Sequence, residues 1–245
     1  MIGFFKTIYF CLLVVTLTFY YALAVVVVSY AYRLRGKKFP FTSGHKIGSA
    51  WGRRIMKLTP GWTVSLSGEE NVPPKGTSYI VVANHESATD IFTIYALGIP
   101  FRWLAKAELF KIPLFGYVAR VCGHIPIQRG VKTSHIAALE LCAQSVREGI
   151  PVFLFPEGTR STEARPKKFK IGAFKLAHEA QVPVLPIVLF GAGKLLKKGS
   201  LTPNRANLRI SILPLVPLIE DESVDQLTQR VEDIVVKEHT RLSQA

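Results

Sequence analysis

The sequence predicts an α/β fold, in which a mostly parallel mixed sheet is flanked by helices, with a helical membrane anchor at the N-terminus. After residue 60, short runs of β-type residues alternate with runs of helical periodicity, which is typical of a parallel sheet covered on both faces. Before residue 60, one long apolar run carries no charge. We therefore expect an anchor over residues 1–60 and one domain over residues 61–245.

The anchor is predicted from the uncharged run between Thr7 and Tyr32. At about 1.5 Å per residue, a helix over this run would be roughly 39 Å long, enough to cross a bilayer with some tilt. The letters "ALA" at 22–24 look like a signal-peptide cleavage site, but the apolar run continues beyond them. Basic residues follow directly in "RLRGKK", which favours an uncleaved anchor and a domain on the cytoplasmic side, at the inner membrane if the source is Gram-negative.

Residues 41–58, "FTSGHKIGSAWGRRIMKL", predict a second, amphipathic helix on the same surface. The anchor is then either one span or two helices dipping into one leaflet. Residues 1–68 hold nine Lys and Arg but no Asp or Glu, within a chain of net charge +14. This favours an anionic membrane surface as partner. The chain has no helix-turn-helix, zinc-finger or aromatic RNA-reading signature, so we expect no nucleic-acid partner.

The predicted strands follow the anchor in order, and three helical segments separate or follow them. The strands are "WTVSLSG" (62–68), "SYIVVA" (78–83), "FRWLAK" (101–106), "HIPIQR" (124–129), "VFLF" (152–155), "VPVLPIVLF" (182–190) and "NLRISIL" (207–213). The helices begin near Ser87, near Lys132 and near Ser223. Three scattered cysteines and histidines without ligand-like spacing predict neither a disulfide nor a metal site, and we expect no cofactor.

The segment "NHESATD" (84–90) places His85 just after a buried strand and Asp90 five residues later. In one continuous helix, five residues would turn the two side chains about 140° apart, so they meet only if the histidine precedes the helix. Ser87 and Asp90 also fit a capping box, in which Asp90 satisfies only N–H groups of the first turn. If the pair forms, the carboxylate fixes the imidazole tautomer, and His85 acts as general base on a substrate hydroxyl. The sequence has no Gly-x-Ser-x-Gly elbow.

The segment "FPEGTRS" (155–161) ends another strand with Glu157, Gly158, Thr159 and Arg160. Gly158 permits a sharp turn, and an arginine fork suits phosphate, so this segment is either an anion and hydroxyl site or an ordinary exposed turn. Arg129 and Lys106 end two further strands, where a lone cation is more often only solvated.

Four segments together resemble the 1-acylglycerol-3-phosphate acyltransferases of the wider glycerolipid acyltransferase family. The family's motifs are Asn-His-x4-Asp, Gly-x-Ile-x-Ile-x-Arg, Phe-Pro-Glu-Gly-Thr-Arg-Ser and Val-Pro-x-x-Pro. They appear here, in order, as "NHESATD", "GHIPIQR", "FPEGTRS" and "VPVLP". The resemblance covers about residues 60–215 and the membrane-associated N-terminus. It implies a glycerol-3-phosphate acyltransferase-like fold, with residues 61–245 as the acyltransferase catalytic domain.

The resemblance implies transfer of an acyl chain from acyl-CoA or acyl-carrier protein to the free sn-2 hydroxyl of lysophosphatidic acid, which gives phosphatidic acid for phospholipid biosynthesis. His85 would be the general base and Asp90 its partner, without an acyl-enzyme. Glu157, Gly158, Thr159 and Arg160 would bind the acceptor, and Arg129 and Lys106 would face its phosphate.

Gln128 stands where the family often has Asp, which puts the identity of the acceptor in doubt. The alternatives are therefore another lysophospholipid or a lyso-aminolipid as acceptor. Two rivals belong to other classes of protein, namely a non-catalytic module that binds anionic lipid and a hydrolase of acyl thioesters or lipids.

Overall fold

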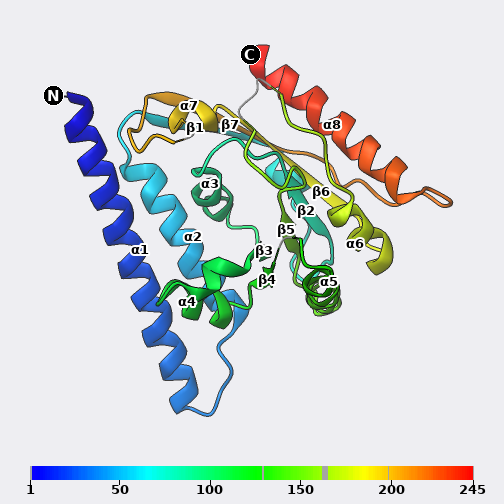
Figure 1. Cartoon of the computed structure of the whole chain (residues 1–245), viewed down its shortest axis with the longest axis horizontal. Helices are drawn as coiled ribbons and strands as arrows, with labels where there is room; N and C mark the ends of the chain where they lie inside the picture. Colours follow the sequence, from blue (N-terminus) through cyan, green and yellow to red (C-terminus); the bar gives the residue numbers. More distant parts are fainter. Residues whose placement is uncertain (1, 129, 162–164, 198, 245) are drawn as a thin grey trace. The chain divides into compact units, whose positions relative to one another are not determined.

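The computed structural model describes residues 2–128, 130–161, 165–197 and 199–244 (Figure 1). The chain forms two compact units. The helical unit consists of residues 1–60, 91–141 and 201–203, and the sheet unit consists of residues 61–90, 142–200 and 204–245. Residues 1–60, the expected anchor, are thus the first part of the helical unit.

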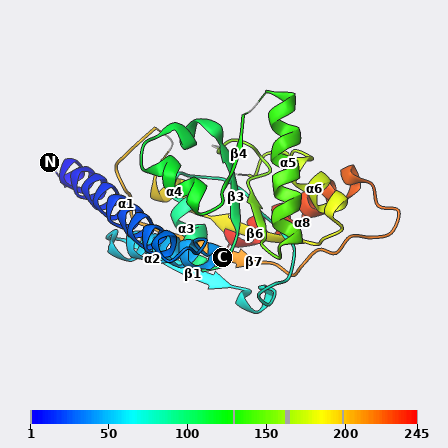
Figure 2. The ribbon, with the colours of Figure 1, turned by 90° about the horizontal axis from the view of Figure 1, so that it is seen from below.

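Two antiparallel helices, α1 (Ile2–Leu34) and α2 (Phe41–Leu58), lie side by side in the helical unit (Figure 1 and Figure 2). The Tyr9 hydroxyl donates to the carbonyl oxygen of Leu58 over 2.9 Å, and Trp51 Nε1 donates to Thr18 Oγ1 over 3.1 Å. Among the described residues, α1 is the one helix long and apolar enough to cross a membrane. α2 therefore packs against one face of this apolar helix.

The rest of the helical unit consists of short elements. They are most of α3 (Asp90–Leu97), β3 (Arg102–Lys106), a 3₁₀ turn η2 (Ala107–Lys111), α4 (Phe115–Val121), β4 (Ile125–Ile127) and the first part of α5 (Lys132–Arg147). β3 and β4 pair in parallel, and the Tyr117 hydroxyl of α4 lies 3.0 Å from Ser29 Oγ of α1.

The sheet unit contains five strands in the order β1-β7-β6-β2-β5. These are β1 (Trp62–Ser67), β2 (Ile80–Ala83), β5 (Val152–Leu154), β6 (Val184–Phe190) and β7 (Ala206–Ile212). β1–β7, β6–β2 and β2–β5 are parallel pairs, whereas β6 and β7 are antiparallel. Every residue of β2 and β5 is buried, as expected for strands covered on both faces. The predicted fold class, a mostly parallel mixed sheet with flanking helices, is confirmed.

The helices of the sheet unit are α6 (Gly172–Ala180), the short α7 (Ala192–Leu195) and α8 (Val224–Gln244), and a 3₁₀ turn η1 (Glu69–Asn71) follows β1. Figure 1 shows α8 running beside β6 and α6. The buried residues of α8 recur every three or four positions, which is the stripe of an amphipathic helix on a sheet.

Candidate active site

The loop after β2 is anchored to the neighbouring strand β6 by its first residue, Asn84. Its side-chain nitrogen donates to the carbonyl oxygen of Leu189, and its Oδ1 accepts the backbone N–H of Leu189, both over 2.8 Å. The buried amide therefore mimics one more residue of strand pairing and fixes the point at which the loop leaves the sheet.

His85 and Asp90 meet as the sequence predicts. His85 Nδ1 lies 2.7 Å from Asp90 Oδ2, and the same oxygen accepts the backbone N–H groups of Glu86 over 2.7 Å and Ser87 over 2.9 Å. The pair forms because α3 begins at Asp90, so that His85 still lies in the extended loop before the helix.

Only half of the expected capping box forms beside this pair. Asp90 reaches back to the N–H of Ser87, but the hydroxyl of Ser87 donates to the carbonyl oxygen of Leu196 over 2.9 Å.

Burial raises the pKa of the fully buried Asp90 above its usual value of 3.8, while the hydrogen bonds from His85 and Ser87 act in the opposite direction. Because Asp90 accepts from Nδ1–H, the neutral imidazole carries its lone pair on Nε2. Phe155 stacks on the imidazole, with 4.0 Å between ring centroids and 13° between ring planes. The ring is thus held by one hydrogen bond and one aromatic face, and its side chain stays 17% exposed.

Strand register brings the two predicted motifs together. β2 pairs with β5 so that Val82 lies opposite Leu154, and the same register three residues further on places His85 opposite Glu157. The N–H of His85 donates to Oε1 of Glu157 over 2.8 Å, and the N–H of Ser161 donates to the carbonyl oxygen of His85 over 2.7 Å. The carboxyl ends of two parallel strands therefore share hydrogen bonds, in keeping with the usual place of ligand sites in such sheets.

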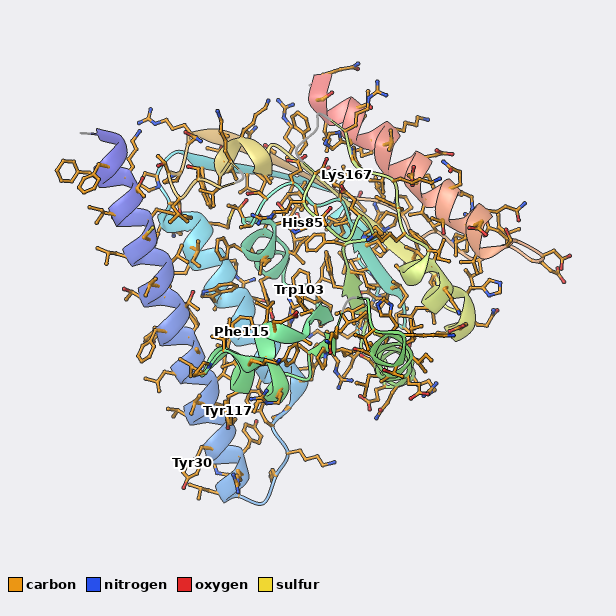
Figure 3. All side chains as sticks on the ribbon, in the orientation of Figure 1. Tyr30, His85, Trp103, Phe115, Tyr117 and Lys167 are labelled. Carbon is orange, nitrogen blue, oxygen red and sulfur yellow. The ribbon has the colours of Figure 1, made fainter. Side chains whose placement is uncertain are left out.

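Glu157 joins a third segment to this site. Its Oε2 accepts the N–H of Lys167 over 3.0 Å, so that both carboxylate oxygens bind backbone donors of the protein itself. Figure 3 labels His85 and Lys167, the two residues that Glu157 connects. Burial raises the pKa of Glu157, and these two N–H groups oppose the rise. A direct contact between Glu157 and the acceptor stays a prediction, since both of its carboxylate oxygens accept backbone N–H groups.

The turn after Glu157 is surrounded by cations. Gly158 has φ of +72°, a conformation that disfavours a side chain, and a Cβ at this position would lie 2.9 Å from Lys170 Nζ. Lys167 Nζ lies 3.4 Å from the carbonyl oxygen of Arg160. Residue Arg160 is half-buried, whereas Thr159 is exposed. The predicted residues 157–160 are thus brought together beside His85, with lysines that the sequence interpretation did not assign to the site.

The other two predicted residues belong to the helical unit. Lys106 ends β3, and its exposed Nζ lies 3.4 Å from Glu108 Oε1, an arrangement typical of a weak surface ion pair. Arg129 lies outside the described residues. The N–H of the preceding Gln128 donates to Ser134 Oγ over 2.8 Å.

Two further residues of the site, Asn84 and Phe155, begin the segments "NHESATD" and "FPEGTRS", yet their roles depend on contacts that only the folded sheet reveals. Their place in these two motifs was the signal for them in the sequence. Within the described ranges, no group of three or more His, Cys, Asp and Glu residues could hold a metal ion.

Comparison with known proteins agrees with this geometry. The model of the family described as Acyltransferase matches residues 63–190. A 1-acyl-sn-glycerol-3-phosphate acyltransferase of Chlamydomonas reinhardtii is 34% identical over 190 residues, which cover 78% of this chain and 56% of that protein. Another, from Borreliella burgdorferi, is 30% identical over 187 residues, which cover 75% of this chain and 74% of that protein. The chain spans about half the length of the first curated relatives it matches.

Solved structures include one that resembles almost the whole chain. The crystal structure of the 1-acyl-sn-glycerophosphate (LPA) acyltransferase PlsC from Thermotoga maritima matches with a TM-score of 0.79 and 26% identity. The match covers 98% of this chain and 97% of that one.

Proposed function

The chain belongs to the acyltransferase family, and from this membership and the His85–Asp90 geometry we propose that it acylates the sn-2 hydroxyl of 1-acylglycerol-3-phosphate. The product is phosphatidic acid, a precursor of membrane phospholipids. The observation that carries the proposal is the 2.7 Å hydrogen bond between His85 Nδ1 and Asp90 Oδ2. It leaves Nε2 as the basic nitrogen, and this is the atom that a general base for a hydroxyl requires.

In the proposed reaction, His85 Nε2 removes the proton of the acceptor hydroxyl while the oxygen attacks the thioester carbonyl of acyl-CoA or acyl-carrier protein. The new C–O bond forms, the C–S bond breaks, and the departing thiolate takes the proton from the imidazolium. The Asp90 carboxylate stabilises that imidazolium. Acceptor and donor react while both are bound, so proximity contributes much of the rate and no acyl-enzyme forms.

The acceptor's phosphate is proposed to bind at the turn 157–160. Arg160 supplies the fork of donors, and Lys167 and Lys170 add positive charge beside the turn. Lys106 and Arg129 remain proposed phosphate contacts. Glu157 acts in this scheme by holding the turn against His85, and Gly158 by allowing the turn to form.

The decisive assay offers purified protein a panel of lysophospholipids and lyso-aminolipids with CoA and carrier-protein thioesters. The proposal expects phosphatidic acid from lysophosphatidic acid. Turnover of another acceptor alone would replace the proposed substrate but keep the chemistry. Free fatty acid without an acceptor would instead indicate a hydrolase. Lipid binding without any thioester consumption would indicate a non-catalytic module.

We further propose that basic residues of the helical unit hold the enzyme at an anionic membrane surface, with the catalytic domain on the cytoplasmic side. The helical unit contains only two acidic residues, Glu108 and Glu140, although it carries almost all of the net positive charge. Exposed aromatic residues lie on α1 and on the adjacent α4, where Tyr30 is 57% exposed, Phe115 43% and Tyr117 41% (Figure 3). Aromatic side chains next to basic ones are typical of the membrane interface.

The packing of α1 on α2 favours the arrangement in which both helices dip into one leaflet. α2 carries Lys46, Arg53, Arg54 and Lys57, and a span by α1 would carry some of these charges into the hydrocarbon core. An impermeant maleimide tests this with Gly3→Cys in a background lacking the native cysteines. Labelling from the cytoplasmic side supports the one-leaflet arrangement, and labelling only from the opposite side contradicts it.

A further inference from the structure

The residue after His85, Glu86, is bound at three points. Its N–H donates to Asp90 Oδ2, its Oε2 accepts the N–H of Gly193 over 3.1 Å, and its Oε1 lies 3.0 Å from Nε2 of His239. The Glu86 side chain is 15% exposed and the His239 side chain 6% exposed. A carboxylate that is largely removed from water requires hydrogen-bond donors. Among the described residues, the Glu86 carboxylate has two such partners, the N–H of Gly193 and the imidazole of His239.

His239 lies on the buried face of α8. The other members of that stripe are Leu227, Thr228, Val231, Val235 and Leu242. The imidazole packs edge-on against Phe190 at the end of β6, with ring centroids 5.2 Å apart and planes at 72°. An ionisable ring thus interrupts an almost entirely apolar stripe at the position where α8 passes the loop that carries His85.

Helix α8 also binds the segment around Lys167, which is the third segment of the site. Glu232, two turns before His239, accepts the N–H of Phe169 through Oε2 over 2.7 Å. Phe169 lies two residues after Lys167, whose N–H donates to Glu157. One helix therefore binds both segments that meet at His85, one through Glu232 and one through His239.

We propose that His239 is a positioning residue for acyl transfer, which holds Glu86 and thereby the backbone that aims His85 at the acceptor hydroxyl. The inference rests on the function proposed above. His239 touches neither reactant in this account. Its effect passes through Glu86, whose N–H binds the same Asp90 oxygen as the His85 imidazole, so that a shift of Glu86 would disturb the partner of the general base. Catalytic side chains keep a productive geometry only when surrounding residues fix them by packing and hydrogen bonds.

The test compares full-length variants in detergent or vesicles. His239→Leu fills the same space without a donor and leaves the buried Glu86 carboxylate short of a partner. We expect kcat to fall by about 10-fold or more while the acceptor KM stays within about twofold. His239→Gln restores a donor and should recover most of kcat. The double variant Glu86→Gln/His239→Leu removes the unpaired charge and should be more active than His239→Leu alone.

The matched control is Val235→Ala, one turn away on the same buried stripe and without a bond to the loop. It should lower the unfolding midpoint and leave kcat unchanged. The proposal is overturned if His239→Leu keeps its kcat, if Val235→Ala loses as much kcat at a similar unfolding midpoint, or if Glu86→Gln brings no recovery.

A second measurement is independent of catalysis. Hydrogen exchange of peptides covering residues 84–90 should be faster in His239→Leu than in Val235→Ala, because the loop opens locally when Glu86 is released. Equal exchange in the two variants overturns the positioning role. If the wild-type protein acylates no lyso-acceptor, the proposed function fails, and this exchange experiment alone still decides whether His239 holds the loop.

Discussion

The backbone N–H of His85 donates to Oε1 of Glu157 over 2.8 Å, although the two residues are 72 positions apart in the sequence. This bond places the proposed general base and the proposed phosphate-binding turn at one edge of the sheet. It also makes Glu157 a part of the scaffold, because its other oxygen binds the N–H of Lys167. The segments "NHESATD" and "FPEGTRS" are therefore joined by hydrogen bonds into one site.

Glu157→Gln should weaken this structure. A glutamine has one acceptor oxygen, so its amide group must face the N–H of either His85 or Lys167, and a buried donor stays unpaired. We expect a loss of about 1–3 kcal/mol in the free energy of unfolding, with a parallel fall in kcat. Glu179→Gln is the control, since its ion pair with Lys175 is half-exposed and should contribute little. Equal stability of the two variants in urea unfolding would contradict the scaffold role.

Asp90→Asn keeps the size of the side chain and removes its charge. The amide oxygen can still accept the N–H groups of Glu86 and Ser87, but it stabilises the imidazolium of His85 less. We expect kcat to fall by about 10²- to 10⁴-fold with the fold retained. Exposed Asp233→Asn is the matched control and should keep wild-type kcat. Near-normal turnover by Asp90→Asn would remove the carboxylate from the mechanism.

The raised pKa of Asp90 also predicts the direction in which stability changes with pH. A carboxyl group whose pKa is raised by folding binds its proton more tightly in the native state, so stability falls as pH rises from 3.8 through the raised value. We expect turnover to rise over the same range, because the proposed mechanism requires the ionised carboxylate. Unfolding free energies measured across this range should fall less steeply in Asp90→Asn than in the wild type. An identical slope would mean that Asp90 has no raised pKa.

Comparing Gly158→Ala with Gly76→Ala separates the effect of backbone strain on stability from an effect on acceptor binding. Gly158 and Gly76 both have positive φ, +72° and +87°, so an alanine at either should cost about 1–2 kcal/mol of stability. A Cβ at Gly76 meets nothing within 4 Å, whereas at Gly158 it displaces Lys170 Nζ. We expect similar losses in unfolding midpoint, but a raised acceptor KM only for Gly158→Ala. Equal KM values in the two variants would argue against an acceptor site at this turn.

Arg160→Ala should mainly weaken acceptor binding. Loss of charged hydrogen bonds to a phosphate, worth about 1.5–3 kcal/mol, corresponds to a rise of about 10- to 100-fold in acceptor KM. Arg147→Ala removes the same charge from an exposed position at the end of α5 and is the control. An unchanged KM for lysophosphatidic acid in Arg160→Ala would exclude Arg160 as the phosphate ligand.

Local spacing showed that His85 and Asp90 can meet, and the resemblance of the motifs turned this possibility into a prediction. Five residues between a strand end and the first turn of a helix allow the two side chains to meet, and α3 begins at Asp90 itself. Alternating strand and helix patterns likewise predicted the class of the sheet. Both inferences, that the two side chains can meet and that the sheet is mostly parallel, depend on residues that are near each other in the sequence. The periods of the helix and the strand are therefore enough to make them.

The bonds that hold the site could not be predicted in the same way. The contact between His85 and Glu157 depends on the register of β2 with β5, and the contact between Glu86 and His239 depends on how α8 lies on β6. Neither register nor helix placement is encoded in the spacing of a single segment. The role of Phe155 was hidden for a similar reason, because stacking on His85 depends on two adjacent strands.

The central claim is that His85 is the general base for acylation of lysophosphatidic acid. It is tested most directly by the rate of phosphatidic acid formation from lysophosphatidic acid and an acyl thioester, for wild-type protein and for His85→Ala. The account predicts a loss of about 10²- to 10⁴-fold or more in kcat, with an unfolding midpoint close to that of the wild type. A folded His85→Ala variant that keeps its kcat within about tenfold of wild type would contradict it.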